Sequence, residues 1–170
     1  MKAFLLTVGG VGMAMMAVSA IHRPPLLVWN VTASAPIGLY RVVAGQPSRG
    51  SLALIFLPEP FRTLLHLRGY LHASLPMLKP IAAEHGDTLC RHGNAVFVNG
   101  RLVALARRID HAARPLPRWR GCQRLGNAVA VISPHPHSFD SRYFGVVDLS
   151  AVVALAVPIW TTDQVPQRQH

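Results

Sequence analysis

The stretch NVTASAPIGLY, residues 30–40, lies between two segments of extended character. The residues before it, PPLLVWNVT from Pro24, indicate a stiff linker that runs into an extended segment, and GLYRVV at its end is apolar and β-prone. Pro36 and Gly38 are typical of a turn, and a small polar residue, Ser34, lies within it. Most serines in such a position only shape the turn, so the rest of the chain decides whether Ser34 has a further role.

Short apolar segments separated by turn residues continue along the chain. GLYRVV and GSLALIFL, on either side of AGQPSRG, predict a β-hairpin, and the turn at Asn99-Gly100 predicts another. LPMLKPIAA, NAVAVISP and GVVDLSAVVALAVPIW predict further strands. PFRTLLHLRGYL has apolar residues near helical spacing, with Gly69 where the helix ends. The pattern therefore predicts a mainly β fold with one helix.

The N-terminal segment is uncharged from residue 3 to residue 21, directly after Lys2. This length is sufficient for a helix to cross a bilayer. It is either a retained anchor or a cleaved secretory signal, because Val-Ser-Ala at residues 18–20 fits a processing site. We expect an anchor or signal in residues 1–22, an exported domain in residues 23–162 and a polar tail in residues 163–170.

The two cysteines, Cys90 and Cys122, both follow the apolar segment. An even pair in an exported domain predicts one disulfide, with two unpaired buried thiols as the alternative. Cysteines this far apart do not match a zinc motif, and His135 and His137 of PHPH are too few ligands for one. We therefore expect neither a metal nor a cofactor.

Arginine dominates the charge of the chain. The net charge of +10 arises from 15 arginines and only two lysines, Lys2 and Lys79. Seven arginines lie in residues 101–124 beside one acid, Asp110, which predicts a solvated basic loop. Contact with phospholipid or with another protein is the alternative. Nucleic-acid binding is not expected, because neither an aromatic-interleaved basic surface nor a groove-reading helix is evident.

Lys79 is the only lysine beyond the N-terminus, and its neighbours in LPMLKPIAA are apolar. An arginine stays protonated at any working pH, whereas a desolvated lysine can lose its proton near neutral pH. A neutral lysine amine can activate a serine hydroxyl in place of histidine, and Ser34 is the candidate serine. The alternative is a snorkelling or ion-paired lysine at a strand end.

The segment SFDSRYFG, residues 138–145, places two hydroxyls, an acid and an arginine within five residues. Asp140 and Arg142 could hold this loop together through a charge-assisted hydrogen bond. A polar β-turn without further function is the alternative.

Taken in this order, these segments resemble the signal peptidase I clan of serine–lysine proteases. The closer resemblance is to its conjugative-transfer branch, the TraF-type signal peptidases. It rests on N-x-T-x-S-x-P-x-G-L-Y around Ser34, on RGYL, LPMLKPIAA and GDTLC around Lys79, and on VFVNGR, WRGC and SFDSRYFG. It spans residues 29–160 and implies a signal-peptidase-like antiparallel β fold behind an N-terminal transmembrane or signal helix.

The resemblance implies a catalytic role for each matching residue. Ser34 would be the nucleophile and Lys79 its general base. Thr32 falls where the clan places a hydroxyl in the oxyanion hole, and the backbone N–H of Ser34 would be the second donor. Ser138 matches a serine that orients the lysine amine.

Further positions match the framework around that site. Asp140 and Arg142 match a pair that braces it, Gly86 and Asp87 match a turn after the lysine strand, and the cysteine pair also fits the conjugative branch. Two positions depart from the pattern of general signal peptidases: Pro80 follows the lysine, and AEHGD replaces LPGD. No substrate preference follows from these differences.

The expected function is that of a membrane-anchored serine endopeptidase in the bacterial inner membrane, with its catalytic domain in the periplasm. Its substrate would be a pilin precursor or another exported protein of a conjugative transfer or type IV secretion apparatus, which it would cleave or cyclise. A general leader peptidase and a non-enzymatic exported scaffold of the same apparatus are the alternatives. The expected partners are the peptide substrate, the membrane and components of that apparatus.

Overall fold

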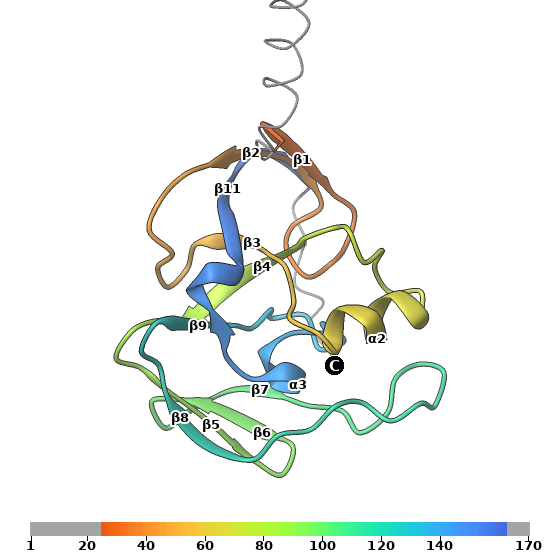
Figure 1. The fold of residues 1–170 in the computed structure, drawn as a ribbon, viewed down its shortest axis with the longest axis vertical. Helices are drawn as coiled ribbons and strands as arrows, with labels where there is room; N and C mark the ends of the chain where they lie inside the picture. The colour runs from red at the N-terminus through yellow and green to blue at the C-terminus, as the bar shows by residue number, and fades with distance from the viewer. Residues whose placement is uncertain (1–24, 163–170) are drawn as a thin grey trace, which may run out of the picture.

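The computed structural model describes residues 25–162, which form two antiparallel β-sheets and two short α-helices (Figure 1). The larger sheet has the strand order β1-β2-β11-β3-β4-β9-β10, and the smaller one has the order β7-β6-β5-β8. The strands are β1 (Leu27–Asn30), β2 (Gly38–Val43), β3 (Leu52–Ile55), β4 (Met77–Ala83), β5 (Thr88–His92), β6 (Ala95–Val98), β7 (Arg101–Leu105), β8 (Gly121–Arg124), β9 (Ala128–Val131), β10 (Val147–Asp148) and β11 (Val152–Thr161). The helices are α2 (Phe61–Leu67), α3 (Ser141–Phe144) and the 3₁₀ turn η1 (Leu149–Ala151).

The predicted mainly β fold is therefore confirmed, and several local predictions are confirmed with it. α2 ends at Leu67, and Gly69 follows the C-cap residue Arg68 with a φ of 71°, a value that favours glycine. β6 and β7 form the hairpin predicted at Asn99-Gly100, where both residues have positive φ as a two-residue turn of this type requires.

The predicted hairpin between GLYRVV and GSLALIFL is wrong. β11, the last strand of the described chain, lies between β2 and β3 and pairs antiparallel with both. Local pattern shows that a segment is β-prone, but strand order depends on which partner buries more apolar surface. β11 pairs with β3 through residues 152–156 along one edge and with β2 through residues 155–161 along the other edge.

The predicted membrane segment, residues 1–22, lies outside the described residues. Within residues 25–162, none of the helices is long and apolar enough to cross a bilayer.

The two faces of the larger sheet are covered differently. Ala53, Ile55 and Ile81 belong to the main core, which also includes residues from α2, β9 and α3. Leu54 and Leu78 point to the opposite face and pack with Tyr40 of β2. This alternation is the period of two that a β-strand imposes on its side chains.

The same alternation explains why a lysine is buried in β4. Lys79 is paired with Ala53 of β3 and lies two residues from Ile81, so it is on the face of the main core. Its side chain is 3% exposed. The strand register therefore forces an amine into an apolar interior.

Candidate active site

The turn that contains Ser34 joins β1 to β2, which pair from Leu27↔Arg41 to Asn30↔Gly38. The side chain of Asn30 is buried beneath this turn, and its Nδ2 donates to the carbonyl oxygens of Thr32, Ala35 and Pro36 at 2.9–3.0 Å. Its Oδ1 accepts hydrogen bonds from the backbone N–H of Thr32 at 3.2 Å and from the Thr32 hydroxyl at 3.0 Å. The side-chain amide of Asn30 thereby provides hydrogen-bond partners for backbone groups of the turn that have no partner in a β-ladder.

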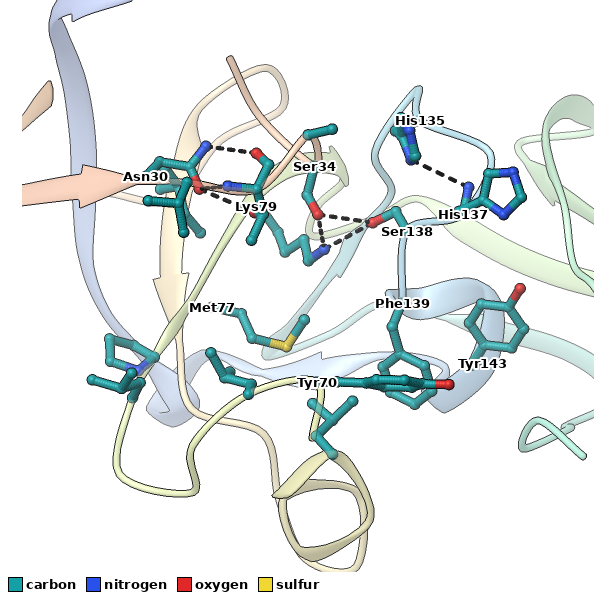
Figure 2. Close-up of a pocket in the computed structure, with 18 of the residues that line it drawn as sticks. Asn30, Ser34, Tyr70, Met77, Lys79, His135, His137, Ser138, Phe139 and Tyr143 are labelled. Carbon is teal, nitrogen blue, oxygen red and sulfur yellow. Dashed lines mark hydrogen bonds between the residues drawn. The ribbon is translucent and has the colours of Figure 1, made fainter. Parts of the chain in front are cut away.

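Ser34, Lys79 and Ser138 come together from three segments that are far apart in the chain (Figure 2). The Lys79 Nζ donates to the Ser34 Oγ at 2.6 Å and to the Ser138 Oγ at 2.8 Å. The two hydroxyl oxygens are 3.4 Å apart. Ser138 is buried, whereas Ser34 is only half-buried. Of the two serines, Ser34 is therefore the one that a molecule in solution can reach.

Burial lowers the pKa of Lys79 from its ordinary value of 10.5 to about 8. The nearby Asp140 carboxylate raises this pKa, and the Arg142 guanidinium lowers it, but loss of hydration is the largest of the three effects. A substantial fraction of the protein therefore carries a neutral amine beside the Ser34 hydroxyl in mildly alkaline solution.

Asp140 and Arg142 form a fully buried ion pair behind the lysine, with Arg142 Nε 2.8 Å from Asp140 Oδ1. Asp140 also accepts the backbone N–H groups of Arg142, at the start of α3, and of Ser133. Arg142 in turn donates to the carbonyl oxygens of Ser133 and Pro136. The pair thus fixes the loop of residues 133–138, which carries Ser138 to the lysine.

A cleft of about 570 Å³ opens over these three residues. Its walls are mainly apolar, with Met77 and Phe139 near Lys79 (Figure 2). Its polar lining includes Thr32, Arg107, His135 and His137. A concave, mainly apolar pocket with a few convergent polar groups is the usual form of a ligand-binding site.

The other predicted positions lie away from the cleft lining. Asp87 accepts from Arg49 and from the Asn99 amide at 2.7 Å, which ties the start of β5 to two neighbouring loops. Gly86 has a φ of 86°, a turn conformation that favours glycine. These two residues position the chain and do not contact the site.

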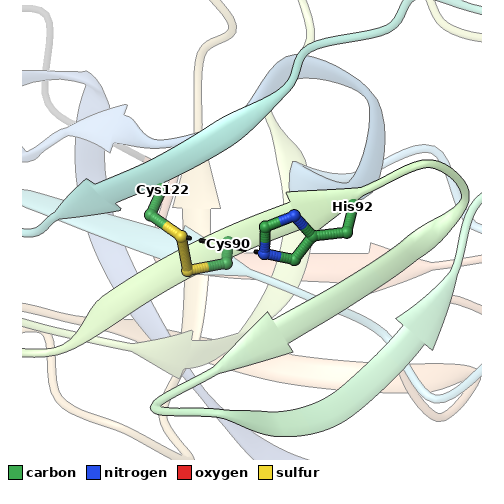
Figure 3. A group of neighbouring side chains, drawn as sticks. All are labelled: Cys90, His92 and Cys122. Atoms are coloured by element: carbon green, nitrogen blue, oxygen red, sulfur yellow. Dashed lines mark hydrogen bonds between the residues drawn. A yellow bond between two sulfur atoms is a disulfide. The ribbon is translucent and has the colours of Figure 1, made fainter.

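Cys90 and Cys122 are directly paired on β5 and β8, and a disulfide joins them (Figure 3). The ring of His92 lies beside this disulfide, with its Nε2 4.0 Å from the Cys122 Sγ. The three residues bring potential metal ligands within 4.8 Å of one another. Both sulfurs are used in the covalent bond, and only the thiolate form of cysteine is a strong metal ligand.

Two residues at the site were not predicted from the sequence. In the sequence, Asn30 is only the first residue of the motif around Ser34, and an asparagine at the start of a turn is typical of turns in general. Arg107 was grouped with the basic loop, but its side chain lines the cleft. The contact that marks Arg107 is with His137, 30 residues away in the chain, whereas all the side-chain hydrogen bonds of Asn30 lie within six residues of it.

Comparison with known proteins identifies the family of this chain. The family model described as signal peptidase, peptidase S26, matches residues 1–161. The chain belongs to this family. Within the signal peptidase family it is 32% identical over 145 residues to the plasmid transfer protein TraF of Escherichia coli, covering 78% of this chain and 81% of that protein. It is 33% identical over 144 residues to the probable conjugal transfer protein TraF of Sinorhizobium fredii, covering 78% of this chain and 76% of that protein.

These relatives confirm the predicted TraF-type branch of the signal peptidase family. Among solved structures, a signal peptidase I from Enterococcus faecalis aligns with a TM-score of 0.36 and 16% identity, covering 66% of this chain and 97% of that one.

Proposed function

We propose that this protein is a membrane-anchored serine endopeptidase that processes an exported precursor for a conjugative transfer apparatus. Ser34 is the nucleophile and Lys79 is its general base. The observation that carries this proposal is a buried amine with a pKa of about 8, placed 2.6 Å from a solvent-accessible serine hydroxyl in an apolar cleft. Membership of the signal peptidase family supports the reaction class.

The hydrogen bonds around Lys79 favour proton transfer from the Ser34 hydroxyl to the lysine amine. When the amine is neutral it still donates an N–H to the Ser138 Oγ, so its lone pair can point to the Ser34 hydroxyl. The amine then takes the Ser34 proton as the oxygen attacks the scissile carbonyl, and it later returns a proton to the leaving amine. Ser138 is thus the residue that orients the base.

The developing oxyanion requires donors on the other side of the carbonyl. We assign this role to the backbone N–H of Ser34 and to the hydroxyl of Thr32. The Thr32 hydroxyl donates to Asn30 in the free protein, and Thr32 is exposed, so the hydroxyl has room to turn toward a bound substrate. Asn30 holds the rest of the turn through its other hydrogen bonds.

The acyl-enzyme has two possible fates. Water releases a carboxylic acid, which is cleavage, whereas an amine of the substrate forms a new peptide bond, which is cyclisation. Because the matched relatives are described as transfer proteins, we propose a pilin precursor as the substrate. We place the catalytic domain, residues 23–162, in the periplasm behind an inner-membrane anchor, a compartment that maintains disulfides such as Cys90–Cys122.

Mass spectrometry of a co-expressed pilin precursor tests this proposal. We expect the wild-type chain to yield a shortened product, with or without the further loss of one water that marks a ring. Ser34→Ala should leave the precursor intact. Ser48→Ala is the matched control, because Ser48 is exposed and lies outside the cleft. A precursor that is still processed in the presence of the Ser34→Ala protein would contradict the proposed role of Ser34. Pilus formation that continues with this variant would favour the non-enzymatic scaffold.

A second assay separates the remaining alternative. A general leader peptidase would restore growth to a strain depleted of its own leader peptidase, whereas a dedicated pilin peptidase would not. The measurement is colony formation after depletion, with Ser34→Ala as the negative control.

A further inference from the structure

Two polar side chains from distant segments meet on the wall of the cleft. Arg107 Nη1 donates to the His137 Nδ1 at 2.6 Å, and both residues are exposed and line the cleft. The backbone N–H of Arg107 also donates to the Tyr143 hydroxyl at 3.1 Å, which holds this part of the loop after β7 against α3. Figure 2 shows His137 next to Ser138 and on the same side as Tyr143.

The position of His137 is set by the framework of the active site. His137 directly precedes Ser138, whose Oγ contacts both Lys79 and Ser34. The His137 backbone N–H donates to the His135 Nδ1, and Arg142 holds the carbonyl of Pro136. The Arg107–His137 pair is therefore held on the segment that also carries Ser138, in the same cleft as Ser34 and Lys79.

Arg107 has no carboxylate within 4.0 Å among residues 25–162. Among the described residues, Asp110 is the one acid that lines the cleft. It is already paired, with Arg114 at 2.8 Å and with Arg68 at 3.5 Å, and it also accepts from the Tyr70 hydroxyl. The wall of the cleft next to His137 thus carries a positive charge without a counter-charge.

The Arg107 guanidinium also has unused donors. Its Nη1 contacts His137, whereas its Nε and Nη2 have no partner within the described part of the chain. A guanidinium presents these N–H groups in a planar arrangement that matches the two oxygens of a carboxylate.

We propose that Arg107 and His137 form a subsite for an acidic side chain, Asp or Glu, of the peptide substrate close to the scissile bond. This inference rests on the proposed endopeptidase function and adds a substrate class to it. The carboxylate accepts from the free edge of the Arg107 guanidinium, while His137 fixes the orientation of that guanidinium. Arg107 is thus a specificity-determining residue.

A pooled library of dodecapeptides of known sequence tests the subsite in two ways. The full-length chain in detergent is incubated with the library, and mass spectrometry identifies the cut bonds. Separately, the Ser34→Ala protein is used to capture peptides from the same library, so that binding is measured without cleavage. Arg107→Gln is the test variant in both experiments. Arg108→Gln is the matched control, because Arg108 is exposed and does not line the cleft.

We expect Asp or Glu to be enriched about tenfold over Asn or Gln at one fixed position near the cut bond, a gain typical of a charge-assisted hydrogen bond. Arg107→Gln should remove this enrichment, and Arg108→Gln should retain it. Acids spread evenly over all positions, or an enrichment that survives Arg107→Gln, would overturn the subsite. If no peptide is cut by the wild-type chain, the proposed function fails. The peptides captured by Ser34→Ala then decide the subsite on their own: acid enrichment that depends on Arg107 supports it, and its absence refutes it.

Discussion

The pKa of Lys79 leads to a quantitative prediction for the pH dependence of peptide cleavage. Only the neutral amine can accept the Ser34 proton, so activity should rise as the pH rises. With a pKa of about 8, roughly one tenth of the lysine is neutral at pH 7 and roughly nine tenths at pH 9. We therefore expect kcat/KM to rise about tenfold between pH 7 and pH 9 and to level off above pH 9.

The assay measures kcat/KM for a cleaved peptide at half-unit steps from pH 6 to pH 10, because this parameter reports the free enzyme. Circular dichroism at each pH controls for unfolding. His135 also lines the cleft, but burial, together with His137, Arg142 and Lys79, holds its pKa below the ordinary value of 6.5. It is therefore already neutral at pH 7 and should not contribute to the rise.

A lysine with its ordinary pKa of 10.5 would give a different profile. The neutral fraction would then increase about a hundredfold between pH 7 and pH 9, with no plateau. Either that profile or a flat one would refute the argument that burial prepares Lys79 as the base.

Three further substitutions test the framework of the site. Lys79→Met should abolish cleavage, yet raise the free energy of unfolding at pH 7 by up to about 3 kcal/mol. Because the pKa of Lys79 is lower in the folded protein than in the unfolded chain, its burial lowers the free energy of unfolding most below pH 8, and this effect disappears as the pH rises toward 10.5. Urea denaturation of both proteins at pH 7 and at pH 10 measures the difference. Asn30→Ala removes the amide donor that three carbonyl oxygens of the turn share, so it should lower kcat at least about tenfold with little change in KM, and lower the free energy of unfolding by about 1–3 kcal/mol. An unchanged kcat in steady-state kinetics would contradict the role of Asn30 in positioning Ser34. The double substitution Cys90→Ser and Cys122→Ser opens a loop whose ends are 32 residues apart in the chain. It should lower the free energy of unfolding by about 3 kcal/mol in the same urea denaturation assay. An unchanged urea midpoint would show that the disulfide contributes nothing to stability.

Local sequence patterns predicted the elements of this fold well because those elements depend on neighbouring residues. The Asn99-Gly100 turn and the helix that ends before Gly69 each follow from backbone preferences within a few residues. The order of the strands does not follow in this way. β11 separates β2 from β3, and no pattern within GLYRVV or GSLALIFL encodes a partner about a hundred residues away.

The candidate site shows the same division. Ser34 and Lys79 were selected because their motifs occur in the order typical of a family, since nothing in either motif alone requires the two residues to meet. Arg107 was missed because its partner His137 is 30 residues away in the chain. Asn30 was missed because an asparagine beside a turn is typical of any turn, although its own hydrogen bonds are local.

The sequence by itself determined that a lone lysine lies in an apolar β-prone segment, that a serine lies in a turn, and that the chain resembles the TraF-type branch of the signal peptidase family. Only the tertiary structure decided that these two side chains are in contact and that the lysine amine is buried away from solvent. The physical reason is that a pKa depends on the dielectric environment and the charges around a group. β3, the loop of residues 133–138 and the Asp140–Arg142 pair surround Lys79 only once the two sheets have formed.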